Sequence, residues 1–225
     1  MVAVELDVRE LGARGVNAAL RELTPGSSAV LRNPDGAHNL AVGLDAGISV
    51  LVDGPAGYYT GGLGKLARVT VAGPAGWGAG ENLMSGTVRV RGDASQSLGA
   101  SAHGGLVIVE GSASLRAGIS LKGATLAVAG DVGAFTGFMA QAGTILIGGN
   151  AGDGLGDSLY EAVIYVAGKI GGLGADAQTE ELSTDDVRVV RDLVKLTGFD
   201  HIDPENVIRV GSGRRLYHFS EGGHL

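Results

Sequence analysis

Seven glycines spaced every 19 residues constrain the fold of this chain more than any other feature of its sequence. The apolar pattern repeats in phase with them, because a Val, Leu or Ile stands two and four residues before each of these marker glycines. Such alternation is typical of a β-strand with one buried side. The marker glycines, none of which slips from the spacing, are Gly54, Gly73, Gly92, Gly111, Gly130, Gly149 and Gly168.

A strand-bearing repeat of this length is too short to enclose a core of its own. Each unit must bury its aliphatic side against the next unit, which predicts a solenoid. We expect an all-β chain: a single-stranded, right-handed parallel β-helix with 19-residue coils, flanked by short N- and C-terminal helical caps. The expected parts are an N-terminal strand and helix cap over residues 1–28, the β-helix over 29–175, and a C-terminal helix and tail over 176–225.

The glycines recur within each unit as well as between units. Counted from the marker, a unit reads Gly-x-x-small-x-x-x-Gly, as in Gly130-Asp-Val-Gly-Ala-Phe-Thr-Gly137. A glycine at the same place in every coil predicts a tight corner, where the backbone needs either a positive φ or room for the neighbouring coil. The sequence therefore predicts a ladder of stacked glycines.

Both ends of the repeat carry helix signals. Near the N-terminus, Val16, Leu20 and Leu23 fall at helical spacing. Beyond the repeat, the segment 180–197 is expected to be a helix, because Ser183-Thr-Asp-Asp186 resembles a capping box and Gly198 follows the last turn. We expect this second helix to cover the open end of the solenoid, where unpaired backbone would otherwise favour aggregation.

The first turn of the solenoid is expected to be irregular. Val30 and Leu31 resemble the repeat but stand one residue out of phase with it. Terminal repeats of solenoids are commonly atypical.

Charge and cysteine content exclude several function classes. The chain has 225 residues and a net charge of −7, which gives no attraction to nucleic acid or to an anionic membrane surface. It has no cysteine, so thiol nucleophiles, thiolate zinc sites and iron–sulfur ligation are excluded on this chain. No signal peptide or membrane span is recognisable, which favours the cytoplasm.

The sequence contains no recognisable catalytic pattern. Gly78-Ala-Gly80 has Leu83 where a dinucleotide fingerprint requires its third glycine, and Gly64-Lys65 is followed by Leu66 in place of Ser or Thr. The five histidines lack the spacing of metal ligands, and no serine lies in a nucleophile elbow. We therefore expect no catalytic, cofactor-binding or metal-binding residue on this chain.

Five aromatic residues share a place in the repeat. All lie four to eight residues after a marker glycine, so they should share one flank of the solenoid. Two interpretations remain open: the terminal segments pack on this flank, or the flank is an interface for a partner. The residues are Tyr58, Tyr59, Trp77, Phe135 and Phe138.

Over about residues 47–175, the glycine pattern on a cysteine-free solenoid resembles the GXGXG β-helix family. Members of that family form the C-terminal domain of the glutamate synthase large subunit and part of a formylmethanofuran dehydrogenase subunit. Three segments look like the stand-alone branch of the family, the glutamate synthase-like B subunits of N-methylglutamate synthases (methylamine-glutamate N-methyltransferases). These segments are Gly80-Glu-Asn-Leu-Met-Ser-Gly86, Phe138-Met-Ala-Gln-Ala-Gly143 and Leu155-Gly-Asp-Ser-Leu-Tyr-Glu-Ala162.

The resemblance implies a non-catalytic scaffold in a hetero-oligomeric enzyme. An amidotransferase-like subunit and a synthase-like subunit with FMN and iron–sulfur clusters would carry the chemistry, which converts methylamine and L-glutamate to N-methyl-L-glutamate and ammonia. No catalytic residue of the family maps onto this chain. Two alternatives stay open: a subunit of formylmethanofuran dehydrogenase or of another glutamate synthase-like complex, and a free-standing ligand-binding β-helix.

Overall fold

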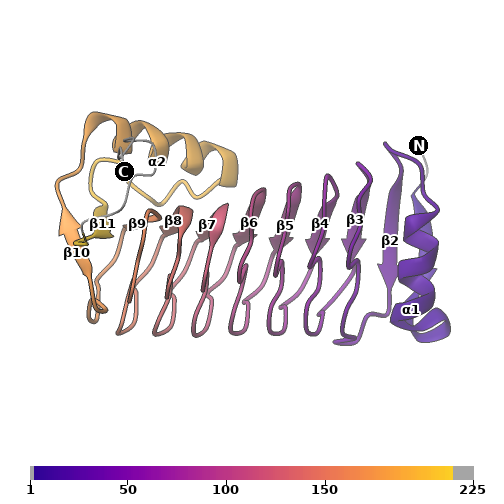
Figure 1. The fold of residues 1–225 in the computed structure, drawn as a ribbon. Helices are drawn as coiled ribbons and strands as arrows, with labels where there is room; N and C mark the ends of the chain where they lie inside the picture. The colour runs from indigo at the N-terminus through magenta and orange to yellow at the C-terminus, as the bar shows by residue number, and fades with distance from the viewer. Residues whose placement is uncertain (1–2, 215–225) are drawn as a thin grey trace, which may run out of the picture.

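The computed structural model describes residues 3–214 and forms a parallel β-helix made from one 11-stranded sheet (Figure 1). The sequence-based prediction of the fold class is confirmed. Residues 1–2 and 215–225, including the end of the predicted C-terminal tail, lie outside the described residues. The strands are β1 Val4–Asp7, β2 Ser28–Arg32, β3 Ser49–Val52, β4 Arg68–Val71, β5 Thr87–Val90, β6 Leu106–Val109, β7 Lys122–Val128, β8 Ala142–Ile147, β9 Val163–Val166, β10 Ala177–Glu180 and β11 Ile208–Ser212.

Strands β3 to β9 pair in parallel with the register that the marker glycines predict. Val52 lies opposite Val71, and Val71 lies opposite Val90. The row they begin is entirely buried, so aliphatic side chains from successive coils form one continuous core. The row consists of Val52, Val71, Val90, Val109, Val128, Ile147 and Val166.

The first coil is longer than the regular coils. Leu31 pairs with Val52, a separation of 52 − 31 = 21 residues, so the offset from the repeat is two residues and the predicted offset of one is wrong for this strand. In the turn after β2, Asn33 and Asp35 adopt left-handed conformations with φ of 52° and 43°. Asparagine and aspartate tolerate this conformation better than most residues do.

The marker glycines are required by close approach of the coils. Among them only Gly54 has a positive φ, of 146°. At Gly149, in contrast, a Cβ atom would lie 2.6 Å from the carbonyl carbon of Gly130 and 2.7 Å from the backbone nitrogen of Asp131. Because a real Cβ atom does not approach backbone atoms so closely, the stacked corners admit only glycine.

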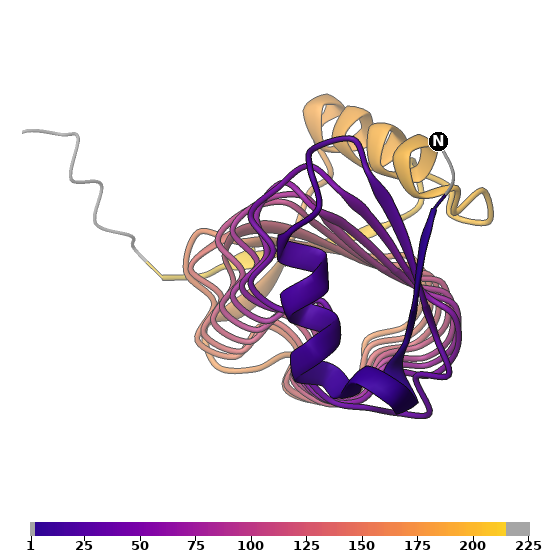
Figure 2. The same ribbon diagram turned by 90° about the vertical axis from the view of Figure 1, so that its right-hand side faces the viewer.

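The N-terminal end of the solenoid is covered by helix α1, Val8–Arg21 (Figure 2). It begins directly after β1, with Asp7 as its N-cap, which is earlier than the helical spacing of Val16, Leu20 and Leu23 indicates. The helical geometry is interrupted at Gly12, where φ is 63°. Val16 and Leu20 are fully buried against the core of the first coils, as their spacing predicts.

Helix α2, Thr184–Thr197, has the predicted capping box and ends at Gly198 in a left-handed conformation. It begins four residues later than the predicted segment 180–197, because Glu180 belongs to β10 and Ser183 is the N-cap. The expectation that it covers the open end is wrong. It lies on the outer face of the sheet over β6 to β9, where Val190 and Val194 pack against the outward side chains of the strands (Figure 1). The end itself is extended by β11, which pairs antiparallel with β9, and by β10, which pairs with β11.

Candidate functional site

Large apolar side chains remain exposed along one side of the coils. They stand four to twelve residues after a marker glycine, on the turn side of the coil, and we call this surface the turn flank. Trp77 is 48% exposed and Tyr59 is 46% exposed. The exposed apolar residues of the turn flank are Tyr58, Tyr59, Leu63, Leu66, Trp77, Met84, Leu115, Phe135, Met139 and Leu173.

The predicted aromatic residues form two groups within the flank. In the first group, the rings of His38 and Tyr58 stack at 4.2 Å between centroids, and Tyr58 stacks on Trp77 at 5.2 Å. In the second, Phe135 meets Phe138 edge to face at 6.2 Å, and Phe138 is half-buried. The position of His38 in the first stack was not predicted. His38 lies in the irregular first coil, where the 19-residue spacing does not give the position of a residue in the coil.

The backbone of the coils accounts for the outward direction of these side chains. Residues five and nine after the marker are left-handed, with φ of 60° at Tyr59 and 58° at Phe135. The Tyr59 N–H donates to the Trp77 carbonyl of the next coil, and the Gly61 N–H donates to the Leu40 carbonyl of the preceding coil. The turns are therefore held by hydrogen bonds between coils, and the stacking of Tyr58 on Trp77 adds a side-chain contact between two of them.

The described terminal segments leave the turn flank exposed. Helix α2 and the segment after it, with Phe199, Ile202 and Val207, pack on the outer face of the sheet. At the other end, α1 reaches the turns mainly through Asn17, whose side-chain amide donates to the Asn39 carbonyl. Within residues 3–214, packing of the termini does not explain the aromatic residues.

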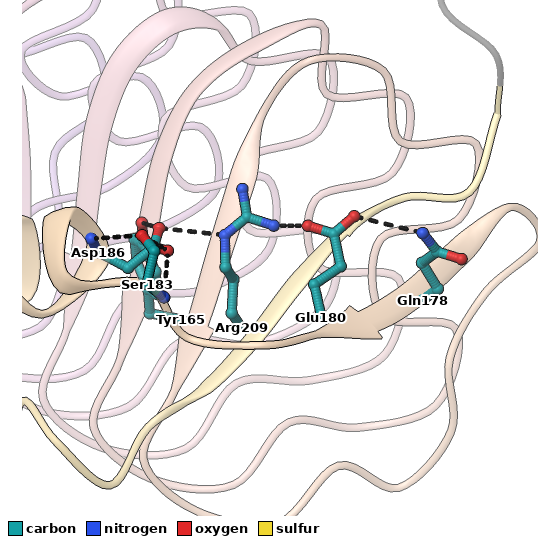
Figure 3. Close-up of polar contacts among 6 residues, drawn as sticks. All are labelled: Tyr165, Gln178, Glu180, Ser183, Asp186 and Arg209. Atoms are coloured by element: carbon teal, nitrogen blue, oxygen red, sulfur yellow. Dashed lines mark hydrogen bonds and ion pairs between the residues drawn. The ribbon is translucent and has the colours of Figure 1, made fainter.

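A polar cluster joins the C-terminal segment to the last coils (Figure 3). The Tyr165 hydroxyl, from β9, donates to the Asp186 carboxylate at 2.5 Å, and the Arg209 Nε donates to the same carboxylate at 3.0 Å. Arg209 also pairs with Glu180, and the Ser183 N–H donates to Asp186 at 2.9 Å. The cluster thus connects β9, β10, α2 and β11.

The electrostatics of this cluster indicate a structural role. Burial raises the pKa of Tyr165, and its hydrogen bond to Asp186 adds to the shift. Burial alone would raise the pKa of Asp186, but hydrogen bonds from Ser183 and Tyr165 hold it below the usual value. A tyrosine that is harder to ionise and a carboxylate fully engaged in hydrogen bonds are poorly suited to proton transfer.

The sequence analysis missed this cluster. Tyr165 continues the outward row of Ile108, Ala127 and Leu146, so it could be placed on the outer face of the sheet. Its partners Asp186 and Arg209 come from segments whose docking no repeat pattern specifies.

The part of the chain that the structure describes contains neither a candidate metal site nor a candidate membrane-spanning helix. Among residues 3–214, no group of three or more His, Asp or Glu side chains is placed to hold a metal ion. No helix within the same residues is long and apolar enough to cross a bilayer. Comparison of the whole sequence with protein-family models and with curated proteins gives no match.

Proposed function

We propose that this chain is a scaffold subunit that binds other protein chains through its turn flank. The observation that carries the proposal is the exposure of aromatic and aliphatic side chains on the turns of most coils of the stack. Contiguous exposed apolar surface on a soluble domain is characteristic of protein interfaces, and aromatic residues contribute much of their binding energy.

The backbone conformation at these positions gives independent support. Tyr59 and Phe135 are left-handed, whereas the equivalent residues of two other coils are Gly78 and Gly154, also left-handed. A bulky side chain at positive φ is unfavourable, and an exposed one gains little from burial. Tyr59 is 46% exposed and Phe135 is 42% exposed, and binding of a partner would bury this remaining apolar area.

The resemblance to the GXGXG family suggests the complex. We propose N-methylglutamate synthase, in which this chain would hold an amidotransferase-like subunit and an FMN and iron–sulfur synthase-like subunit in register, in the cytoplasm. The reaction would convert methylamine and L-glutamate to N-methyl-L-glutamate and ammonia. The redox centres would lie on the synthase-like partner, since this chain has no cysteine to ligate a cluster.

Affinity purification of the chain from its native host, followed by an absorption spectrum and an assay with methylamine and glutamate, tests this function. We expect two larger chains, a flavin spectrum and formation of N-methylglutamate. Co-purification of a molybdenum or tungsten pterin would replace this proposal with formylmethanofuran dehydrogenase. A colourless chain that purifies alone would contradict the scaffold function.

A further inference from the structure

A small hollow lies within the turn flank, near the N-terminal end of the solenoid. It has a volume of about 250 Å³ and combines apolar walls with polar groups. Tyr59 and Leu63 give it exposed apolar surface, and Glu81 and Asn82 from the next coil give it side-chain oxygen and nitrogen atoms. The remaining lining residues are Asn39, Val42 and Gly62.

Glu81 carries a carboxylate without a partner in this hollow. Among the described residues its side chain makes no hydrogen bond and no ion pair, while its backbone carbonyl accepts from the Leu63 N–H. The side chain is half-buried, and this burial raises the pKa of Glu81. A partly desolvated, unpaired carboxylate costs free energy in the isolated chain, and an incoming cation would offset that cost.

The backbone leaves space for this carboxylate beside an aromatic ring. A Cβ atom at Gly78 would lie 2.7 Å from the Glu81 Oε2 and 3.0 Å from two ring carbons of Tyr59. Glycine at this position therefore lets the carboxylate and the Tyr59 ring occupy neighbouring space. The two groups are arranged so that one cation could contact both.

Arg21 contacts a residue that lines the hollow without pairing with Glu81. Arg21, at the end of α1, donates to the carbonyl of Val42 at 3.1 Å and makes no ion pair with Glu81. The side-chain amide of Asn82 makes no hydrogen bond within the described residues. The hollow thus presents negative charge and an amide to whatever occupies it.

We propose that this hollow receives an arginine side chain of the partner subunit, which would make Glu81 a charged anchor within the apolar turn flank. The partner in this inference rests on the proposed scaffold function. A guanidinium group matches a carboxylate with two parallel hydrogen bonds and also packs on aromatic faces, so it fits both Glu81 and Tyr59. One carboxylate is too few ligands for a stable metal site, and the negative charge disfavours an anion.

The hollow can be tested without any partner. The chain, labelled with ¹⁵N, is titrated with N-acetylarginine amide and, in parallel, with N-acetylcitrulline amide, which has nearly the same shape and no charge. We expect saturable shifts of the amide signals of Tyr59, Leu63 and Asn82 with the arginine compound only. Glu81→Gln should abolish these shifts, whereas Glu181→Gln, at an exposed glutamate that makes no ion pair within residues 3–214, should leave them unchanged. Equal shifts with both compounds, or no shifts, would overturn the inference.

A second experiment measures the affinity of the chain for its partner chains. Glu81→Gln should weaken capture of the partner by roughly tenfold, as expected for loss of one member of an interfacial charge pair. Unchanged affinity in a folded Glu81→Gln chain would remove Glu81 as the anchor while leaving the scaffold function intact. If the wild-type chain captures no partner, the scaffold function fails, and the titration alone decides whether the hollow binds a guanidinium group.

Discussion

The outer face of the sheet and the turn flank are two surfaces of the same coils, but apolar side chains are buried on the first and exposed on the second. On the outer face, the row Ile108, Ala127, Leu146 and Tyr165 is buried beneath helix α2 and the segment that follows it. On the turn flank, side chains such as Trp77 stay about half exposed. Within residues 3–214, the chain covers the outer face with α2 and the segment after it, and it leaves the turn flank uncovered.

The difference shows how a repeat can separate stability from binding. The outer face is covered by a helix that follows the solenoid in the same chain, so its apolar row contributes to folding. The turns are held together by backbone hydrogen bonds between coils, and their large side chains stay about half exposed. Four experiments, taken in order of expected effect, test this division.

The largest effect is expected at the glycine ladder beneath both surfaces. In Gly149→Val the new side chain would overlap the backbone of Gly130 and Asp131, and we expect a loss of about 3 kcal/mol or more in the free energy of unfolding. Thermal unfolding followed by circular dichroism measures it. The matched control is Gly47→Val, since a Cβ atom at Gly47 meets no atom within 4 Å. Equal stability of the two variants would contradict the stacked corner.

A matched pair of leucine substitutions compares the two surfaces directly. Leu146→Ala removes a fully buried side chain beneath α2 and should cost about 2–4 kcal/mol. Leu63→Ala removes a side chain that is 56% exposed on the turn flank and should change the stability by less than about 0.5 kcal/mol. Chemical denaturation of both variants gives the comparison. A similar loss in both would show that the flank contributes to folding.

The polar cluster under α2 should give a smaller, pH-dependent effect. Tyr165→Phe removes the hydroxyl donor to Asp186 and should cost about 1 kcal/mol at pH 7. Because the folded-state pKa of Asp186 is lowered, its contribution is present above the ordinary pKa of 3.8 and is lost as the pH falls through the folded value. The difference between wild type and variant should therefore shrink in acid. A difference that stays constant as the pH falls far below 3.8 would contradict this role for Asp186.

The smallest effect, opposite in sign, is expected at Glu81. Because burial raises the pKa of this carboxyl in the folded chain, its ionised form opposes folding above that pKa and ceases to do so below the ordinary value of 4.5. Glu81→Gln should raise the melting temperature at pH 7 by about 1 °C, and the difference should vanish near pH 4. A lower melting temperature at pH 7 would show that the carboxylate stabilises the isolated chain.

Most of the solenoid could be predicted from the sequence because its repeat is regular. The strand register from β3 to β9 follows directly from the marker glycines, and the capping box fixes the start of α2. The position of α2 could not be predicted, since its apolar stripe fits an open end and an outer sheet face equally well. The repeat predicts that Ile108, Ala127, Leu146 and Tyr165 lie on the outer face, where α2 packs. It does not predict that Tyr165 bonds to Asp186.

The turn flank was predicted in outline and its details were not. Periodicity placed Tyr59 and Phe135 on the turn side of the coils, but not their left-handed backbone. It also gave no reason to associate Glu81 with Tyr59, because they lie in different coils and no single motif contains both. Such contacts depend on the stacking of neighbouring turns in space.

The most direct test of the scaffold account is native mass spectrometry of the affinity-purified chain, with wild type compared with the combined variant Tyr58→Ser, Trp77→Ser and Phe135→Ser. These side chains are 40–48% exposed, so the variant should keep its fold and melting temperature. The account predicts that the wild-type chain is recovered with two larger chains and that the variant is recovered alone. Recovery of the same complex with both chains would contradict the turn flank as the binding surface.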